Sequence, residues 1–159
     1  MRQVIVSICL MFLIVTLASC GPSEPDHLEA VTDEPLVEEI TAFVQAYKQA
    51  MHLAINENKT DELEETYLIP NTSFYHALHR LREDLQKAGS QKNLVSLEVN
   101  DVWFDPEEKD YFADADEHVQ VITGDEVEDI ERSVRFHIVK GSDDTFRLYT
   151  IIDRTNKNE

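Results

Sequence analysis

Two histidines, His76 and His79, stand three residues apart in a segment with the periodicity of a helix. That spacing can bring two imidazoles to one face of a helix, as the ligands of a zinc ion require. The chain has no HExxH motif, and no cysteine near these histidines could complete a tetrahedral site. The sequence therefore predicts a surface or pocket pair of histidines, and neither a metal nor another cofactor.

Two short segments are rich in carboxylates, the ligands that Ca²⁺ prefers. Both lack the order of acids, with a central glycine, that makes an EF-hand loop. We therefore predict a solvated acidic rim and keep a calcium site as the alternative. The carboxylates are Asp105, Glu107, Glu108, Asp110, Asp114, Asp116 and Glu117 in the first segment, and Asp125, Glu126, Glu128, Asp129 and Glu131 in the second.

A third reactive group is the thiol of Cys20, which follows an uncharged, apolar run over residues 4–18. A helix over this run spans about 22 Å, less than the ~30 Å hydrocarbon core, so the run fits a cleaved leader better than a spanning helix. The residues at 17–20, Leu-Ala-Ser-Cys, resemble the lipobox of bacterial lipoproteins. The resemblance implies a signal peptide over residues 1–19, cleavage before Cys20, and acylation of that cysteine by fatty acids such as palmitate. It also implies a lipid-anchored protein on the extracytoplasmic face of the cell membrane, at a Gram-positive surface.

The segment after Cys20 has the composition of a linker. Residues 21–35 contain three prolines and five acids, which favours an extended, polar chain that reaches about 20 Å. We therefore predict an acidic tether over residues 20–35, a single domain over residues 36–154 and a short tail over residues 155–159. The only other cysteine, Cys9, lies in the leader, so no disulfide is expected in the mature domain.

Apolar residues over 36–54 recur at steps of three and four, which predicts a helix that begins near Pro35 and frays near residues 56–58. A short helix over residues 62–67 is expected to end before Pro70. A third helix is expected to begin at Asn71 or Thr72 and to end at Gly89.

After Gly89 the apolar period changes from about 3.6 to 2. Val99 and Val102 are out of phase in the first strand, so an extra residue at 100–101 indicates a β-bulge. Further strands are predicted near residues 111–121, 133–138 and 146–152, the last with residues 146, 148, 150 and 152 on one face. Helices followed by strands favour an α+β fold, in which N-terminal helices pack on a bent, four-stranded antiparallel sheet.

Four stretches of the chain carry a family resemblance: residues 43–47, residues 54–56, Tyr67 with Leu68, and residues 146–151. With the order of elements, they resemble the cone-shaped, cystatin-like fold of nuclear transport factor 2 and ketosteroid isomerase. More narrowly, residues 36–153 resemble the nuclear-transport-factor-like domain that ends the teicoplanin-resistance-associated (TcaA-type) proteins of Gram-positive bacteria. That family usually carries a zinc ribbon and a membrane helix before its extracytoplasmic domains, and the predicted lipid anchor would replace them here.

The resemblance also implies a pocket between the first helix and the sheet. Candidate pocket residues are Tyr47, Tyr75, His79, Trp103 and His137. Their spacing contains no acid–base pair, and no catalytic residue can be assigned by motif. We therefore expect no catalytic residues.

Charge narrows the choice of partner. The chain has a formal net charge of −18, which argues against nucleic acid, because phosphate binding requires clustered Lys and Arg. The membrane is expected to be a partner through the lipid alone. The first hypothesis is a non-catalytic envelope domain that binds a protein or a small ligand. The alternatives are a small pocket enzyme, such as an isomerase or hydrolase, and an acidic assembly factor that binds basic peptides.

Overall fold

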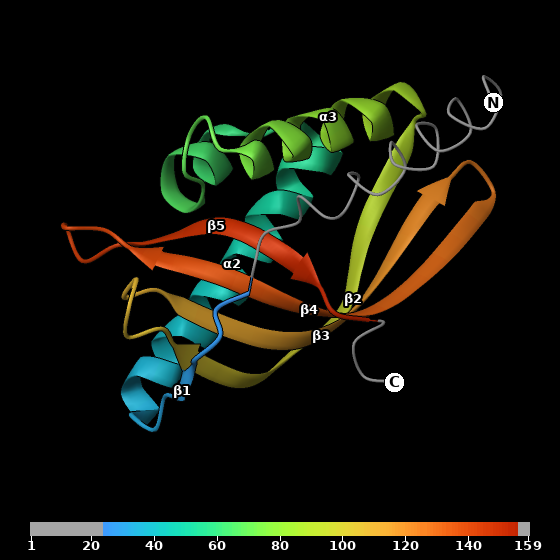
Figure 1. Ribbon diagram of the computed structural model, residues 1–159. Helices are drawn as coiled ribbons and strands as arrows, with labels where there is room; N and C mark the ends of the chain where they lie inside the picture. The colour runs from blue at the N-terminus through green and yellow to red at the C-terminus, as the bar shows by residue number, and fades with distance from the viewer. Residues whose placement is uncertain (1–23, 156–159) are drawn as a thin grey trace, which may run out of the picture.

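The structure of the protein is a computed structural model that describes residues 24–155 (Figure 1). The predicted signal peptide, Cys20 and most of the predicted tail lie outside these residues. Three helices come first after a short strand: α2 (Glu34–Glu57), η1 (Leu63–Tyr67), which is a π-helical turn, and α3 (Ser73–Lys87). Within residues 24–155, no helix is long and apolar enough to cross a membrane.

The helix ends follow local chemistry. Pro35 lies in the first turn of α2, where its missing N–H removes no hydrogen bond. The side chain of Thr72 accepts a hydrogen bond of 3.1 Å from the backbone N–H of Tyr75 and so caps α3. Gly89 follows α3 with a φ of +66°, a left-handed conformation that glycine adopts without strain.

The strands form one antiparallel sheet in the order β1-β2-β3-β4-β5. Their bounds are Glu29–Ala30, Ser90–Phe104, Tyr111–Thr123, Glu126–Lys140 and Phe146–Asp153. The predicted α+β fold is confirmed, with five strands where four were expected. The additional strand, β1, pairs with the end of β2 at Trp103 and Phe104, so part of the predicted tether belongs to the sheet. Two residues are too few to show a strand period, which is why the sequence pattern did not reveal β1.

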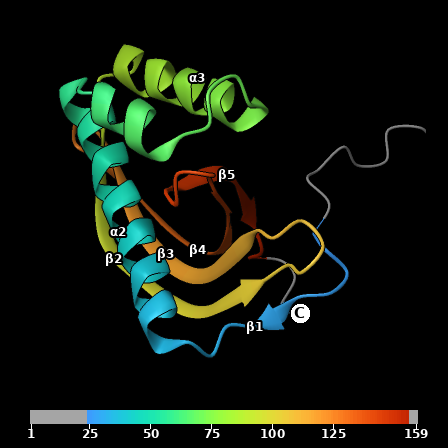
Figure 2. The ribbon, with the colours of Figure 1, turned by 90° about the vertical axis from the view of Figure 1, so that its left-hand side faces the viewer.

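Irregular pairings bend the long strands. The register of β2 against β3 shifts between Val99 and Asp101, where the bulge was predicted, and again between Leu94 and Ser96. A third shift between β4 and β5, beside Tyr149, changes the phase of β5. As a result Ile151, and not Ile152, packs against the core. Bulges increase local twist and bend a strand, and the sheet is correspondingly curled (Figure 2).

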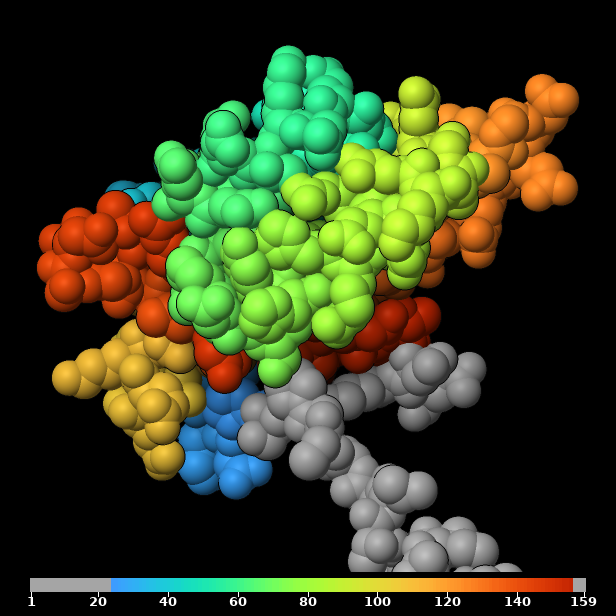
Figure 3. Space-filling view, turned by 90° about the horizontal axis from the view of Figure 1, so that it is seen from above, coloured from blue at the N-terminus to red at the C-terminus, as the bar shows by residue number. Residues whose placement is uncertain are grey.

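Helix α2 lies along the inner face of the curled sheet, and α3 crosses over one end of it (Figure 2). From the helix side, η1 and α3 cover much of the molecule, with part of β5 emerging beside α3 (Figure 3). The core lies between α2 and the central strands. Its members include Ile40, Val44, Met51 and Ile55 from α2, Ala113 and Ala115 from β3, and Val134, Phe136 and Ile138 from β4.

Candidate functional site: a charged cavity inside the cone

A cavity of about 180 Å³ lies between α2, α3 and the inner face of the sheet. We call it the cone cavity. Its apolar lining comes from Met51, Phe74, Leu78, Leu81, Val134 and Ile151, and its polar lining from Tyr47, Lys48, Lys92, Arg132 and Asp153. Most of the polar lining residues are cationic, which is unusual for a chain with a net charge of −18.

An ion pair between two buried side chains lies beside the cone cavity. Lys48 of α2 and Glu117 of β3 form this pair, and both side chains are fully buried. The Nε atom of Arg132 on β4 lies 2.5 Å from Oε1 of Glu117, so one carboxylate serves two cations. Burial alone would raise the pKa of Glu117, but Lys48 and Arg132 outweigh it and hold the pKa below its usual value. Glu117 is therefore ionised at neutral pH.

Lys92 of β2 is a second buried cation beside the cone cavity, with only 6% of its surface exposed. Its backbone is held by α2: the Lys92 N–H donates to Oδ1 of Asn56 at 2.8 Å, and its carbonyl accepts from Nδ2 of Asn56 at 2.7 Å. The same carbonyl lies 2.9 Å from Nδ1 of His52, which must therefore carry the proton.

The ammonium of Lys92 has no comparable partner. Within residues 24–155, no carboxylate forms an ion pair with it, in contrast to Lys48 and Arg132. Burial, reinforced by the positive charges of Lys48 and Arg132, lowers the pKa of Lys92 to about 8. Lys92 therefore carries a largely uncompensated charge into the cone cavity at neutral pH.

Tyr47 is the predicted pocket residue that the structure places in the cone cavity. Its side chain is completely buried, and its hydroxyl donates to Sδ of Met51 at 3.5 Å. Burial, together with the nearby charge of Glu117, raises the pKa of the Tyr47 phenol far above its usual range. The hydroxyl is a neutral hydrogen-bonding group and a poor proton acceptor.

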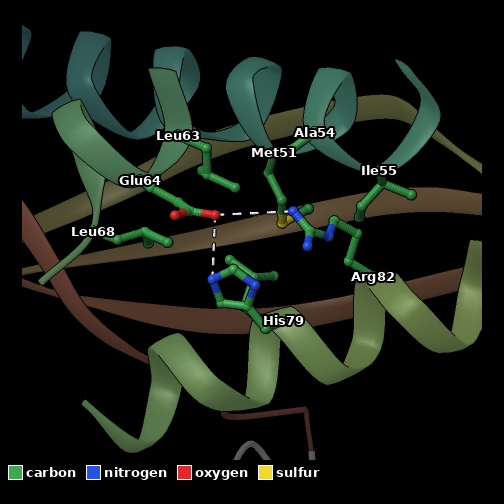
Figure 4. Close-up of a pocket in the computed structure, with 9 residues that line it drawn as sticks. Met51, Ala54, Ile55, Leu63, Glu64, Leu68, His79 and Arg82 are labelled. Atoms are coloured by element: carbon green, nitrogen blue, oxygen red, sulfur yellow. Dashed lines mark ion pairs between the residues drawn. The ribbon is translucent and has the colours of Figure 1, made fainter. Parts of the chain in front are cut away.

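His79 of α3 lines a different and much smaller pocket (Figure 4). Tyr75 lies on the same helix, and the centroid of its ring is 4.4 Å from that of His79. Glu64 joins them: its carboxylate lies 3.0 Å from the Tyr75 hydroxyl and 3.3 Å from Nε2 of His79. Arg82 lies 3.9 Å from the same carboxylate. The free volume of about 10 Å³ leaves room for little more than one water, so these contacts fasten α3 to η1.

Trp103 and His137 lie on the outer face of the sheet. The indole N–H of Trp103 donates to Asp114 at 3.0 Å, and His137 lies 2.7 Å from Asp110 while its ring stacks on Phe112. The five candidate pocket residues thus fall into three separate places, and the cone cavity contains one of them.

The chain matches the family described as the TcaA protein NTF2-like domain over residues 36–152. The chain belongs to this family. An uncharacterized protein of Alkalihalophilus pseudofirmus is 43% identical over 145 residues, which cover 89% of this chain and 91% of that protein. The family resemblance drawn from the sequence is therefore confirmed, and membership indicates an envelope-associated protein.

Solved structures with little sequence identity share the cone fold of this TcaA-type domain. The intermembrane space region of the chloroplast protein ARC6 is similar with a TM-score of 0.59 and 10% identity, covering 73% of this chain and 94% of that one. A Catenulispora acidiphila protein in complex with S-DNPA has a TM-score of 0.51 and 19% identity, covering 73% and 92%. Aln2 from a Streptomyces species has a TM-score of 0.51 and 11% identity, covering 75% and 92%.

The acidic segments of this TcaA-type domain differ from each other in structure. In the first segment, Asp114 forms an ion pair of 2.6 Å with Arg135, and Asp116 accepts a hydrogen bond of 2.5 Å from the hydroxyl of Ser133. These two carboxylates therefore link β3 to β4. The second segment, residues 125–131, lies on the exposed hairpin of β3 and β4. Within residues 24–155, no group of three or more His, Cys, Asp or Glu side chains is arranged to hold a metal ion.

Four residues in or beside the cone cavity of the TcaA-type domain were not among the predicted pocket residues: Lys48, Lys92, Glu117 and Arg132. Two of them carried a signal in the sequence. Lys48 follows Val44 by four residues and precedes Met51 by three, which is the buried face of the helix. Glu117 continues the alternation of Ala113 and Ala115 on the inner face of β3.

Proposed function

We propose that this protein is a lipid-anchored, extracytoplasmic binding domain of the cell envelope, and that the cone cavity is its ligand site. The observation that carries the binding role is Lys92, a residue with only 6% of its surface exposed, which lines an open cavity and has no carboxylate partner within residues 24–155. A buried charge without a partner costs stability. Such a charge in a cavity is typical of a functional site.

Binding fits the chemistry of the cone cavity better than catalysis. Glu117 is shared by two cations, and the Tyr47 phenol is held in its neutral form. Neither group is therefore ready to exchange a proton with a ligand. The complex of the Catenulispora acidiphila protein with S-DNPA supports the proposal, because it is an example of a protein of this fold with a bound compound.

One observation favours an enzyme as the second candidate. The pKa of Lys92 is lowered to about 8 by burial beside other cations. Lysines of this kind can attack a carbonyl as the free amine and lose water to form an imine. The enzyme ranks second because imine chemistry also needs an acid or base beside the lysine to move protons. Among the described residues, Glu117 is already paired with two cations. Asp153 is exposed, and its carboxylate accepts a hydrogen bond of 2.9 Å from the N–H of Thr155.

The ligand site can be tested by a nuclear magnetic resonance screen of small molecules. We expect ligands to shift the amide signals of Phe74, Lys92 and Ile151, which line the cone cavity and not the small pocket beside His79. The signals of Gly124 and Asp125, at the tip of the β3–β4 hairpin, serve as the internal control and should not move. A set of ligands that shifts only residues outside the cone cavity would contradict the proposed site.

The anchor can be tested by metabolic labelling with an alkyne fatty acid. We expect wild-type protein to take up the label and Cys20→Ala to lose it completely, because the thiol is the acceptor of the lipid. Cys9→Ala is the matched control, since Cys9 lies in the predicted signal peptide and should be absent from the mature, labelled protein. Label that persists in Cys20→Ala would show that the anchor is elsewhere.

A further inference from the structure

We propose that the cone cavity binds a small amphipathic anion, whose head group pairs with Lys92 and Arg132 while its apolar part lies against α3 and β5. The inference rests on the proposed binding function and adds the chemical class of the ligand. It follows from charge, lining and size.

The charge of the cone cavity is opposite to that of the whole protein. The cone cavity has three cations, Lys48, Lys92 and Arg132. Among residues 24–155, the carboxylates at the cavity are Glu117 beside it and Asp153 at its rim. The side chain of Lys48 is fully buried and already paired with Glu117, whereas the side chain of Arg132 keeps 31% of its surface exposed. Lys92 and Arg132 are therefore the cations that can turn toward a ligand, and an anionic head group would supply the charge that Lys92 lacks.

The rest of the lining is apolar, and it comes from a different side. Phe74, Leu78 and Leu81 face the cone cavity from α3, and Ile151 faces it from β5. Leu81 is 42% exposed, so an apolar group in the cone cavity would cover surface that now contacts water. The cone cavity therefore favours a molecule that has an apolar part, which is buried against α3 and β5, and a charged group, which pairs with the cations on the other side.

The volume limits the size of this molecule. A cavity of about 180 Å³ has the volume of about six water molecules at their liquid density. A head group with a short alkyl chain fits this space, whereas a full-length lipid or a folded peptide would extend beyond it. The anionic head can be a carboxylate or a phosphate, since both accept hydrogen bonds from Lys and Arg.

Isothermal titration calorimetry with four probes of similar length tests the inference: hexanoate, hexyl phosphate, hexanol and hexylammonium. We expect hexanoate or hexyl phosphate to bind with a millimolar or lower Kd, and the tighter of the two identifies the head group. Hexanol and hexylammonium should bind at least tenfold more weakly, because they lack the charge that pairs with Lys92. Acetate, which has the head group without the chain, should also bind more weakly.

Three variants locate the binding. Lys92→Met should weaken hexanoate binding about tenfold to a hundredfold, the effect expected for a hydrogen bond to a charged group. Leu81→Glu places a negative charge at an exposed position of the lining and should weaken it as well, without a change in the buried core. Lys87→Met, which removes a charge from a side chain that is 73% exposed, alters the net charge equally and should leave the affinity unchanged.

The possible failures are distinct. Suppose that hexanol or hexylammonium binds as tightly as hexanoate, and that Leu81→Glu or Lys92→Met weakens this binding. The inference that the ligand is an anion would then be wrong, while the cone cavity would remain a binding site. Equal affinity of wild type and Lys92→Met for hexanoate would also overturn this inference. No binding by any of the four probes would count against both the inference and the cone cavity as a ligand site.

Discussion

Lys48→Met is expected to lower the free energy of unfolding by about 3 kcal/mol, because it leaves Glu117 charged in a buried position. Methionine keeps most of the volume of the lysine side chain, so the loss reports the charge and not a cavity. Arg132 still contacts Glu117, but its own partly exposed position makes it an incomplete substitute. Urea unfolding at neutral pH measures the effect.

The double variant Lys48→Met/Glu117→Gln is the control for this prediction. Removing both charges of a buried pair is often neutral, whereas removing one is strongly destabilising. We therefore expect the double variant to recover most of the loss, with Arg132 free to turn toward water. A loss below about 1 kcal/mol in the single variant, the value typical of exposed pairs, would show that Glu117 is not held as a buried anion.

Lys92→Met is expected to have the opposite effect on stability: it should raise the free energy of unfolding at pH 7 by about 1–3 kcal/mol. The lysine is charged and buried without a carboxylate partner within residues 24–155, whereas methionine is an unbranched side chain that carries no charge. A stabilising substitution at a residue needed for binding is the trade-off expected of functional sites. Burial has the largest effect on the pKa of Lys92, followed by the charges of Lys48 from α2, Arg132 from β4 and Glu117 from β3. His52 of α2 and Asp153 of β5 are the other titratable groups in this region.

The dependence of this effect on pH follows from the pKa of Lys92, which is about 8 in the folded protein against 10.5 in an unperturbed lysine. Between these values the unfolded chain holds a proton that the folded protein has released, so the contribution of Lys92 to stability rises with pH. Below about pH 8 both states are protonated and the cost of the buried charge is felt in full. The advantage of Lys92→Met should therefore be largest at pH 7 and shrink toward pH 10, while Lys87→Met shows no such change. Destabilisation by Lys92→Met at pH 7 would contradict the assignment of Lys92 as an uncompensated charge.

The order of helices and strands could be predicted from the sequence because it depends on local patterns. The apolar steps of α2 and the change of period after Gly89 reflect which faces are buried, and both appear in the structure at nearly the expected residues. The bulge near Asn100 was visible because it reverses which residues are apolar. The shift beside Tyr149 was not visible, because Tyr149, Ile151 and Ile152 can all occupy either face of a strand.

The cone cavity could be predicted only in part, because its character depends on residues far apart in the chain. Tyr47 was expected in a pocket, but Tyr75, His79, Trp103 and His137 lie elsewhere. A charged residue in a sequence is normally expected to be exposed. Burial of Lys48 becomes acceptable only through Glu117 and Arg132, which are 69 and 84 positions further along the chain. No local pattern records that pairing, although the apolar neighbours of Lys48 and Glu117 mark both positions as inward-facing.

A crystal structure of the protein grown with hexanoate at pH 7 tests the ligand site most directly. The account predicts electron density for the molecule between α2, α3 and the sheet, with its carboxylate within hydrogen-bonding distance of Nζ of Lys92 and its chain against Leu78 and Leu81. A cone cavity closed by its own side chains, or hexanoate bound only on the outer face of the sheet, would contradict it.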